Sequence, residues 1–327
     1  MTVERQALLT VRDLHVHFPV RGEGPFPDER TLKAVNGVDL DVFPGETLGI
    51  VGESGCGKST LARAILNLIP ATSGQVVWLG KDMAGAKASD WQEVRKHAQM
   101  VFQDPLASLN PRMNVAQIIG EPLRTHKPEL SKEEVLARVK QVMLRVGLMD
   151  NQLYRYPHEF SGGQCQRIGI ARALILEPKL IVCDEPVSAL DVSIQAQIVN
   201  LLKDVQQQMQ LALIFIAHDL AVVKHVSQRI LVMYLGRVME LAEKQELYAV
   251  PKHPYTRALL SAVPLADPRR ERGKQVQLLS GDLPSPLDPP SGCVFRTRCP
   301  HAFNRCALQV PPLKAVTDKA QVACWLY

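Results

Sequence analysis

The sequence has 327 residues, of which 46% are hydrophobic and 22% are charged, with a formal net charge of +5. This composition is ordinary for globular proteins and excludes a mostly disordered chain, a collagen and a coiled-coil rod. No apolar stretch approaches the ~20 residues that a membrane-spanning helix needs, and the first residues lack the pattern of a secretory signal. The seven cysteines favour a reduced, cytosolic protein over a disulfide scaffold.

Six apolar segments are typical of β-strands, and the stretches between them have helical periodicity, which indicates an α/β fold. Two of these strands, at 180–183 and 213–216, are apolar throughout, as expected for parallel strands covered on both faces. A helix is predicted from Ser131 to Gly147, because Ser131 and Glu134 form a capping-box pattern before an apolar stripe. The six predicted strands are 8–18, 46–51, 75–79, 179–183, 211–217 and 229–234.

A glycine-rich loop follows the strand at 46–51 and matches G-x-x-x-x-G-K-[ST], with a helix expected from Ser59. Its glycines allow successive backbone N–H groups to face phosphate oxygens, and the start of the helix adds partial positive charge. Lys58 is expected to reach the β- and γ-phosphates, and the Ser59 hydroxyl to bind Mg²⁺. The predicted nucleoside-triphosphate site consists of Gly52, Glu53, Ser54, Gly55, Cys56, Gly57, Lys58, Ser59 and Thr60.

Two acidic residues, Asp184 and Glu185, end the apolar strand at 179–183. At the end of a buried strand, Asp184 is expected to hold Mg²⁺, and Glu185 to orient and partly deprotonate an attacking water. An apolar strand followed by two acids also fits a plain strand and polar turn. The phosphate-binding loop upstream favours the catalytic interpretation.

A second glycine-containing turn, formed by Ser161, Gly162, Gly163 and Gln164, precedes a helical pattern at 167–176. Ser161 is a candidate N-cap, and the two glycines leave room for a phosphate beside the start of a helix. On local grounds, a capped helix after a glycine turn is as good an interpretation as a second anion site.

These segments resemble the ABC-type ATPases, in which a Ser-Gly-Gly-Gln signature lies upstream of the Mg²⁺ aspartate and completes the ATP site of the opposite subunit. The resemblance therefore implies that the turn at 161–164 contacts a nucleotide bound by another chain. The resemblance assigns the sensing of Mg²⁺ and of the attacking water to Gln103, which is also a candidate Mg²⁺ ligand. It places Asp191 at the dimer seam and His218 near the γ-phosphate, and it implies that Phe18 stacks on the adenine. A phenylalanine at the end of a strand fits a place in the core equally well.

The resemblance also implies a P-loop NTPase core with a parallel sheet, an antiparallel β subdomain, and a helical subdomain at about 105–165 that grips a helix of the membrane partner. Composition changes near residue 250, since 251–327 carries eleven Lys or Arg against five Asp or Glu and holds 11 of the 23 prolines. We expect an ABC ATPase domain at 1–250 and a small, basic, Cys-containing C-terminal extension at 251–327. Its charge favours a solvated surface, and no nucleic acid is expected as a partner.

Two further segments, 104–112 and 253–260, are similar to the ATPase subunits of dipeptide and oligopeptide importers, and most to the second ATPase of the oligopeptide system. The resemblance implies an ATPase, peripheral on the cytoplasmic face of the inner membrane, that couples ATP hydrolysis to oligopeptide uptake. Its partners would be a sister ATPase in a heterodimer, two transmembrane permease subunits and, indirectly, an extracytoplasmic peptide-binding protein. Dipeptide or nickel import stays open, whereas a DNA-repair ATPase is disfavoured by the single cassette and the lack of heptads.

Four cysteines lie in the C-terminal extension. In a cytosolic chain they favour a metal site over disulfides, and four thiolates suit either Zn²⁺ or a [4Fe–4S] cluster. The resemblance favours the iron–sulfur cluster, because members of the peptide-importer subfamily can carry one here. Four reduced structural thiols are the alternative. The predicted ligands are Cys293, Cys299, Cys306 and Cys324.

Overall fold

The computed structural model describes residues 6–21, 29–264, 267, 269, 272–274, 277, 279 and 281–327. The chain divides into two compact units, and each is built from segments that are distant in sequence. The first unit consists of Met1–Leu8, Val42–Thr47 and Trp78–Ile216, and the second of Leu9–Asp41, Leu48–Val77 and Ala217–Tyr327.

The first unit contains three parallel strands that neighbour one another in the order β8-β7-β6. Strands β7 (Leu180–Asp184) and β8 (Ala212–Ala217) are buried at every residue. This confirms that the two continuously apolar segments form parallel strands with both faces covered. Strand β6 (Ala98–Val101) pairs with β7 from the other side, and helices α2 and α5 contact it.

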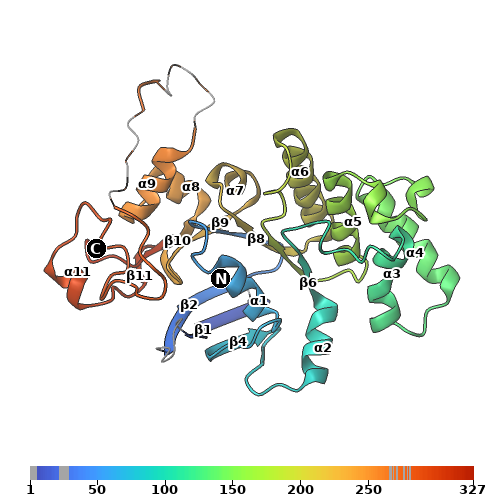
Figure 1. Ribbon diagram of the computed structural model, residues 1–327, viewed down its shortest axis with the longest axis horizontal. Coiled ribbons are helices and arrows are strands. Elements are labelled where there is room, and N and C mark those ends of the chain that lie inside the picture. The colour runs from blue at the N-terminus through green and yellow to red at the C-terminus, as the bar shows by residue number, and fades with distance from the viewer. Residues whose placement is uncertain are drawn as a thin grey trace, which may run out of the picture. The chain divides into compact units, whose positions relative to one another are not determined.

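Helices α3 (Val115–His126), α4 (Lys132–Arg145) and α5 (Gly162–Leu174) pack against one another (Figure 1). Helix α4 begins where its capping box predicts. The Ser131 Oγ accepts the Glu134 N–H at 3.2 Å, and the Glu134 carboxylate accepts the Ser131 N–H at 2.8 Å. The other elements of this unit are β5 (Lys81–Asp82), α2 (Ala88–His97), the 3-10 turns η1 (Asp150–Gln152) and η2 (Pro157–Glu159), and α6 (Val192–Met209).

The second unit contains five strands of mixed orientation that neighbour one another in the order β11-β12-β10-β9-β3. Strand β3 (Thr47–Val51) is parallel to β9 (Arg229–Tyr234), and β10 (Arg237–Glu243) is antiparallel to β9. Two short C-terminal strands, β12 (Ala320–Val322) and β11 (Lys314–Thr317), extend this sheet in the antiparallel sense. The sequence predicts neither of these two strands, because they are short and β11 has no buried residue that could give an apolar alternation.

A separate sheet in the second unit contains β2 (Glu29–Val42), β1 (Leu9–Arg21) and β4 (Ser73–Trp78), in that order. It corresponds to the β subdomain that the sequence analysis predicts. The helices of the unit whose bounds lie among the described residues are α1 (Lys58–Ile65), α7 (Leu220–Val226), α8 (Lys244–Ala249), α9 (Pro254–Ala262) and α11 (Asn304–Leu308). In the part of the chain that the structure describes, none of the helices combines the length and apolarity needed to cross a bilayer.

Candidate nucleotide-binding site

The phosphate loop (52–60) connects β3 to α1, and α1 begins at Lys58 directly after Gly57. The first N–H groups of an α-helix have no partner within the helix, and Gly57 has no side chain that could cap them. The start of α1 is therefore suited to an anion. The Lys58 side chain is buried, and its Nζ donates to the carbonyl oxygens of Gly52 at 2.9 Å and Glu53 at 3.0 Å. In this position, the ammonium group can exchange loop carbonyls for phosphate oxygens.

Close backbone contacts require glycine at two positions of the phosphate loop. A Cβ at Gly57, where φ is +101°, would lie 2.0 Å from the carbonyl oxygen of Ala34, and one at Gly52 would lie 2.2 Å from that of Met233. Both distances are too short for any side chain. At Gly55, where φ is +76°, a Cβ would meet nothing described within 4 Å. One side of the loop is therefore crowded and the other is open, which fits a triphosphate.

The strand β7 brings the two predicted acids to its carboxyl end in the first unit. Asp184 is fully buried and Glu185 is half-buried. Glu185 has φ +45°, a left-handed conformation that is costly for a residue with a side chain and is common at functional sites. Gln103 Nε2 donates to Glu185 Oε2 at 3.0 Å. The structure therefore brings the predicted water-sensing glutamine and the predicted general base together.

The signature turn (161–164) starts helix α5 and is capped by its own residues. The Ser161 Oγ accepts the Gln164 N–H at 3.4 Å, and Gln164 Oε1 accepts the Ser161 N–H at 3.1 Å. The helix begins at Gly162, earlier than the predicted 167, because this capping box fixes its first turn. Ser161 and Gly162 are exposed, so the turn is accessible at the surface of the first unit.

Asp191, predicted at the dimer seam, is the N-cap of α6. Hydrogen bonds from the Ser193 hydroxyl and the Ile194 N–H lower the pKa of Asp191. The same segment packs on the signature turn, since a Cβ at Gly163 would lie only 2.5 Å from Ile194 Cγ2. The role of Asp191 at the seam stays a prediction, while its structural role as a helix cap is clear.

Two predicted site residues of the second unit stay predictions. His218 is exposed and directly follows β8, and Phe18 is half-buried on β1. Beside His218, Asp219 caps α7 by accepting the Ala221 N–H at 2.7 Å. This cap fixes the backbone next to the histidine.

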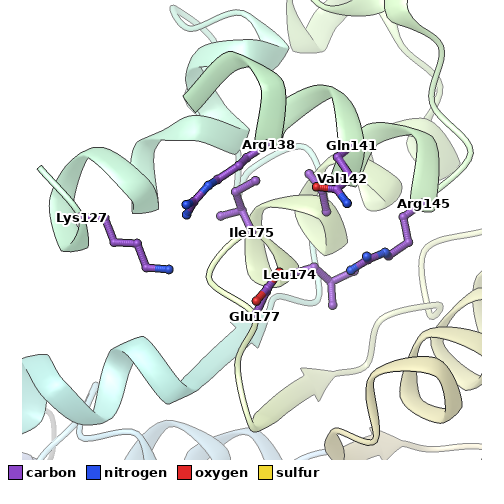
Figure 2. A pocket seen from close by; sticks show the side chains of 8 residues that line it. All are labelled: Lys127, Arg138, Gln141, Val142, Arg145, Leu174, Ile175 and Glu177. Atoms are coloured by element: carbon purple, nitrogen blue, oxygen red, sulfur yellow. The ribbon is translucent and has the colours of Figure 1, made fainter. Parts of the chain in front are cut away.

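A separate hollow of about 250 Å³ lies among the helices of the first unit. In Figure 2, Arg138 and Arg145 of α4 surround it together with Lys127 and Glu177. None of the residues lining it belongs to the predicted nucleotide site. It is therefore a different feature of the helical region.

The sequence analysis missed the residues that contact Glu53 of the phosphate loop. Arg298 forms an ion pair with the Glu53 carboxylate, and Tyr255 accepts a hydrogen bond from the Glu53 N–H. Both residues come from the C-terminal part of the chain, so no local pattern connects them to the loop. The one available signal was the similarity of the segment 253–260 to peptide importers.

Comparison with known proteins identifies the family. The family model for ABC transporters matches residues 35–188, and that for the oligopeptide/dipeptide transporter C-terminal region matches 239–306. The oligopeptide transport ATP-binding protein OppF of Salmonella typhimurium is 65% identical over 324 residues, covering 98% of this chain and 96% of that protein. The chain belongs to the oligopeptide transport ATP-binding proteins of the ABC family. OppF of Haemophilus influenzae is 60% identical over 99% of both chains, and AppF of Bacillus subtilis is 51% identical over 99% of this chain and 98% of its own.

Solved structures of ABC proteins share the fold. The ATP-binding cassette MJ0796, in a dimeric post-hydrolysis state bound to ADP and Pi, has a TM-score of 0.64 and 26% identity, covering 72% of this chain and 98% of its own. CbiO1 from Clostridium perfringens, part of the cbiONQ transporter complex, has a TM-score of 0.63 and 27% identity, covering 75% and 91%. The predicted P-loop NTPase fold and the predicted ATPase of the peptide-importer subfamily are confirmed.

The prediction of an iron–sulfur cluster or a zinc ion in the C-terminal extension is wrong. Among the residues that the structure describes, no group of three or more His, Cys, Asp or Glu could hold a metal ion. The alternative of reduced thiols fits better, because all four are free: Cys293, Cys299, Cys306 and Cys324.

Proposed function

We propose that the chain binds and hydrolyses ATP at a composite site shared with a sister ATPase and thereby drives oligopeptide uptake. The observation that carries this proposal is the phosphate loop, in which Gly57 leads directly into α1 and the Lys58 ammonium donates to two loop carbonyls. The names of the relatives, oligopeptide transport ATP-binding proteins, support the substrate class.

The ligands that we assign to Mg²⁺ are Ser59 in the second unit and Asp184 and Gln103 in the first. Hydroxyl, carboxylate and amide oxygens are the donors that Mg²⁺ prefers. When bound, the ion neutralises charge on the β- and γ-phosphates. Among these residues, Asp184 carries the negative charge, and it is fully buried at the end of β7.

In the proposed reaction, Glu185 accepts a proton from the water that attacks the γ-phosphate. Gln103 holds the Glu185 carboxylate through Nε2 and so fixes the direction in which that carboxylate faces. His218 contacts the γ-phosphate, and Phe18 stacks on the adenine. Lys58 stabilises the negative charge of the phosphates as the bond to the leaving group breaks.

We assign the signature turn to the ATP site of the opposite subunit. Its exposed Ser161 and Gly162 at the start of α5 support this assignment, because a helix N-terminus favours negative charge. The dimeric state of the cassette MJ0796 with ADP and Pi supports an ATP-linked dimer. We further propose a peripheral position on the cytoplasmic face of the inner membrane.

The partners that we propose are a sister ATPase in a heterodimer, two permease subunits and, indirectly, a peptide-binding protein. The helical subdomain at about 105–165 would contact a permease helix. The division into an ATPase domain at 1–250 and an extension at 251–327 remains part of the same proposal, and the family model for the C-terminal region, which starts at residue 239, supports it.

The test uses the chain purified with its transporter partners. Glu185→Gln should hydrolyse ATP at least ~10²-fold more slowly, because a general base contributes that much, while ATP binding is retained. Fluorescent ATP analogues report binding, and phosphate release reports hydrolysis. Turnover like that of the wild type would remove Glu185 from its role.

A second variant tests the sharing of the site between subunits. Ser161→Arg should abolish hydrolysis while ATP stays bound to the phosphate loop of the same chain, because the added side chain blocks the partner's nucleotide. The substitution Ser131→Arg, at the cap of α4, is the matched control. Normal hydrolysis by the Ser161 variant would contradict completion of the site by the opposite subunit.

A further inference from the structure

Glu53, the second residue of the phosphate loop, is held by an arginine that follows 245 residues later. Arg298 Nη1 donates to both carboxylate oxygens of Glu53, at 3.0 and 2.9 Å. The Arg298 side chain is only 12% exposed and that of Glu53 is 25% exposed. Charge-assisted hydrogen bonds that are shielded in this way are stronger than surface ion pairs.

The backbone of the same loop residue is held by a second side chain from the C-terminal region. The Glu53 N–H donates to the Tyr255 hydroxyl oxygen at 3.0 Å. Tyr255 is fully buried in α9. Two residues outside the loop therefore fix both the side chain and the backbone of Glu53.

Tyr255 belongs to a compact group of aromatic rings, and Arg298 contacts the same group. The ring centroids of Tyr234 and Tyr255 are 4.8 Å apart, and Phe295 lies 5.3 Å from each of them. Tyr234 and Phe295 are fully buried. The Tyr234 hydroxyl also lies 3.5 Å from Arg298 Nη1. Because buried rings in contact have little freedom, the positions of Tyr255 and Arg298 are well defined.

The start of α9 is anchored by a buried acid on β10. The Glu240 carboxylate accepts the N–H groups of Lys252 and His253, both at 2.9 Å. His253 Nδ1 in turn accepts the Tyr255 N–H at 3.1 Å. The His-Pro-Tyr segment is therefore a support that places the Tyr255 hydroxyl under the phosphate loop.

The supported residue contacts the loop lysine directly. Lys58 Nζ donates to the Glu53 carbonyl oxygen at 3.0 Å, and the Cys56 N–H donates to the same oxygen at 3.3 Å. A rotation of the Glu53 backbone would move this carbonyl and with it the resting position of the ammonium group. The C-terminal contacts therefore reach the phosphate-binding atoms through one intermediate residue.

We propose that Arg298 and Tyr255 are positioning residues for ATP: they act through Glu53 and hold the phosphate loop in the conformation that accepts the triphosphate. This proposal rests on the nucleotide site proposed above. It gives the C-terminal extension a role in nucleotide affinity, although all of the predicted nucleotide-site residues lie outside that extension.

The test compares the wild type with Arg298→Gln, each purified with its transporter partners. Loss of a charge-assisted contact should raise the KM and Kd for MgATP about tenfold, with kcat changed by less than about twofold, since the contact acts on binding. Arg298→Lys should recover part of the affinity. Tyr255→Phe, which loses the acceptor for the Glu53 N–H, should also raise KM.

Arg296→Gln is the matched control, because Arg296 lies two residues away and, among the described residues, donates to Ser291: to its carbonyl oxygen at 2.9 Å and its hydroxyl at 3.3 Å. It should leave KM unchanged. Glu53→Gln provides a variant that leaves the C-terminal extension intact and should raise KM as Arg298→Gln does. The double variant should be no worse than either single one, because both remove the same contact.

Three results would overturn the proposal. They are an unchanged KM in Arg298→Gln, an equal effect of Arg296→Gln, and multiplied effects in the double variant with Glu53→Gln. If Arg298→Gln does not fold, an unchanged KM in Glu53→Gln overturns it. Lys58→Ala distinguishes failure of the positioning proposal from failure of the nucleotide site, because retained ATP binding in that variant would contradict the nucleotide site itself.

Discussion

Two glycine-containing turns begin helices in this protein, and they are stabilised in opposite ways. The signature turn is closed by its own residues, since Ser161 and Gln164 cap each other across three positions. The phosphate loop depends on residues far away in sequence, among them Ala34, which crowds Gly57, and Arg298, which pairs with Glu53.

The difference shows how a helix start is prepared for different tasks. A turn that satisfies its own backbone groups is complete without a ligand. A turn that glycine begins has no side-chain cap of its own, and its conformation depends on residues that pack against it. The comparison predicts that substitutions at Ala34 or Arg298 affect the phosphate loop and leave the signature turn unchanged.

The largest expected effect follows from Lys58→Ala. Loss of charge-assisted hydrogen bonds to two phosphates should weaken ATP binding by about 10³-fold. Equilibrium binding of a fluorescent ATP analogue measures this change, and Lys132→Ala, at an exposed position of α4, is the control. ATP binding that is unchanged in Lys58→Ala would contradict the assignment of the phosphate loop as the nucleotide site, and with it the comparison of the two turns.

Alanine in place of a glycine in each turn measures how firmly each backbone is fixed. Gly57→Ala should lower the free energy of unfolding by about 3 kcal/mol. The alanine would have to adopt the left-handed φ of Gly57, and its Cβ would also clash with the Ala34 carbonyl oxygen. Gly163→Ala meets a side chain, Ile194, which can shift, and should cost about 1–2 kcal/mol. Urea unfolding of the two variants gives both values. An equal cost would contradict the proposed difference in rigidity.

Acid should weaken the support of the phosphate loop through His253. Burial lowers the pKa of His253 from 6.5 to about 3, so between these pH values the unfolded chain binds a proton that the folded chain does not. Stability therefore falls as the pH drops below 6.5, by about 2 kcal/mol at pH 5. Unfolding of the wild type and of His253→Gln at pH 7 and pH 5 measures this difference.

The exposed His301 supplies the control for that experiment, since His301→Gln should keep the full pH dependence. Burial raises the pKa of Glu240, which acts in the opposite direction. Glu240 and the nearby Arg257 are present in all three proteins, so the difference between them isolates His253. A pH dependence that is the same in His253→Gln would contradict the prediction.

The smallest expected effect concerns the cap of the signature turn. Ser161→Ala and Ser131→Ala each remove one capping hydroxyl and should each cost about 1 kcal/mol of stability. Only the Ser161 variant should also slow ATP hydrolysis in the assembled transporter. Equal rates of ATP hydrolysis in the two variants would indicate that Ser161 serves as a helix cap and has no role at the ATP site.

The sequence predicts the parts of the site that are local. The phosphate loop, the acids after β7 and the capping boxes each lie within a few residues, so their spacing carries the chemistry. The resemblance assigns Gln103 to the Mg²⁺ ion and the attacking water, and the structure adds its contact with Glu185. The ion pair between Glu53 and Arg298 does not, because nothing near either residue identifies the other.

The C-terminal extension shows the limit most clearly. Its four cysteines suggest metal ligands, but spacing cannot show whether sulfurs converge, and the part of the chain that the structure describes holds no group that could bind a metal ion. The sequence does not predict strand β12, which pairs with β10, because three residues are too few to show the alternation of apolar and polar side chains that marks a strand. Tertiary contacts, and not local preference, form this part of the chain.

The pairing of Arg298 with Glu53 has a consequence for protein synthesis. The loop residues leave the ribosome long before the arginine does, so a nascent chain would lack this contact until residue 298 has been made. Products that stop before residue 298 would bind nucleotide weakly. Full affinity would then be reserved for polypeptides that have been made nearly to the end.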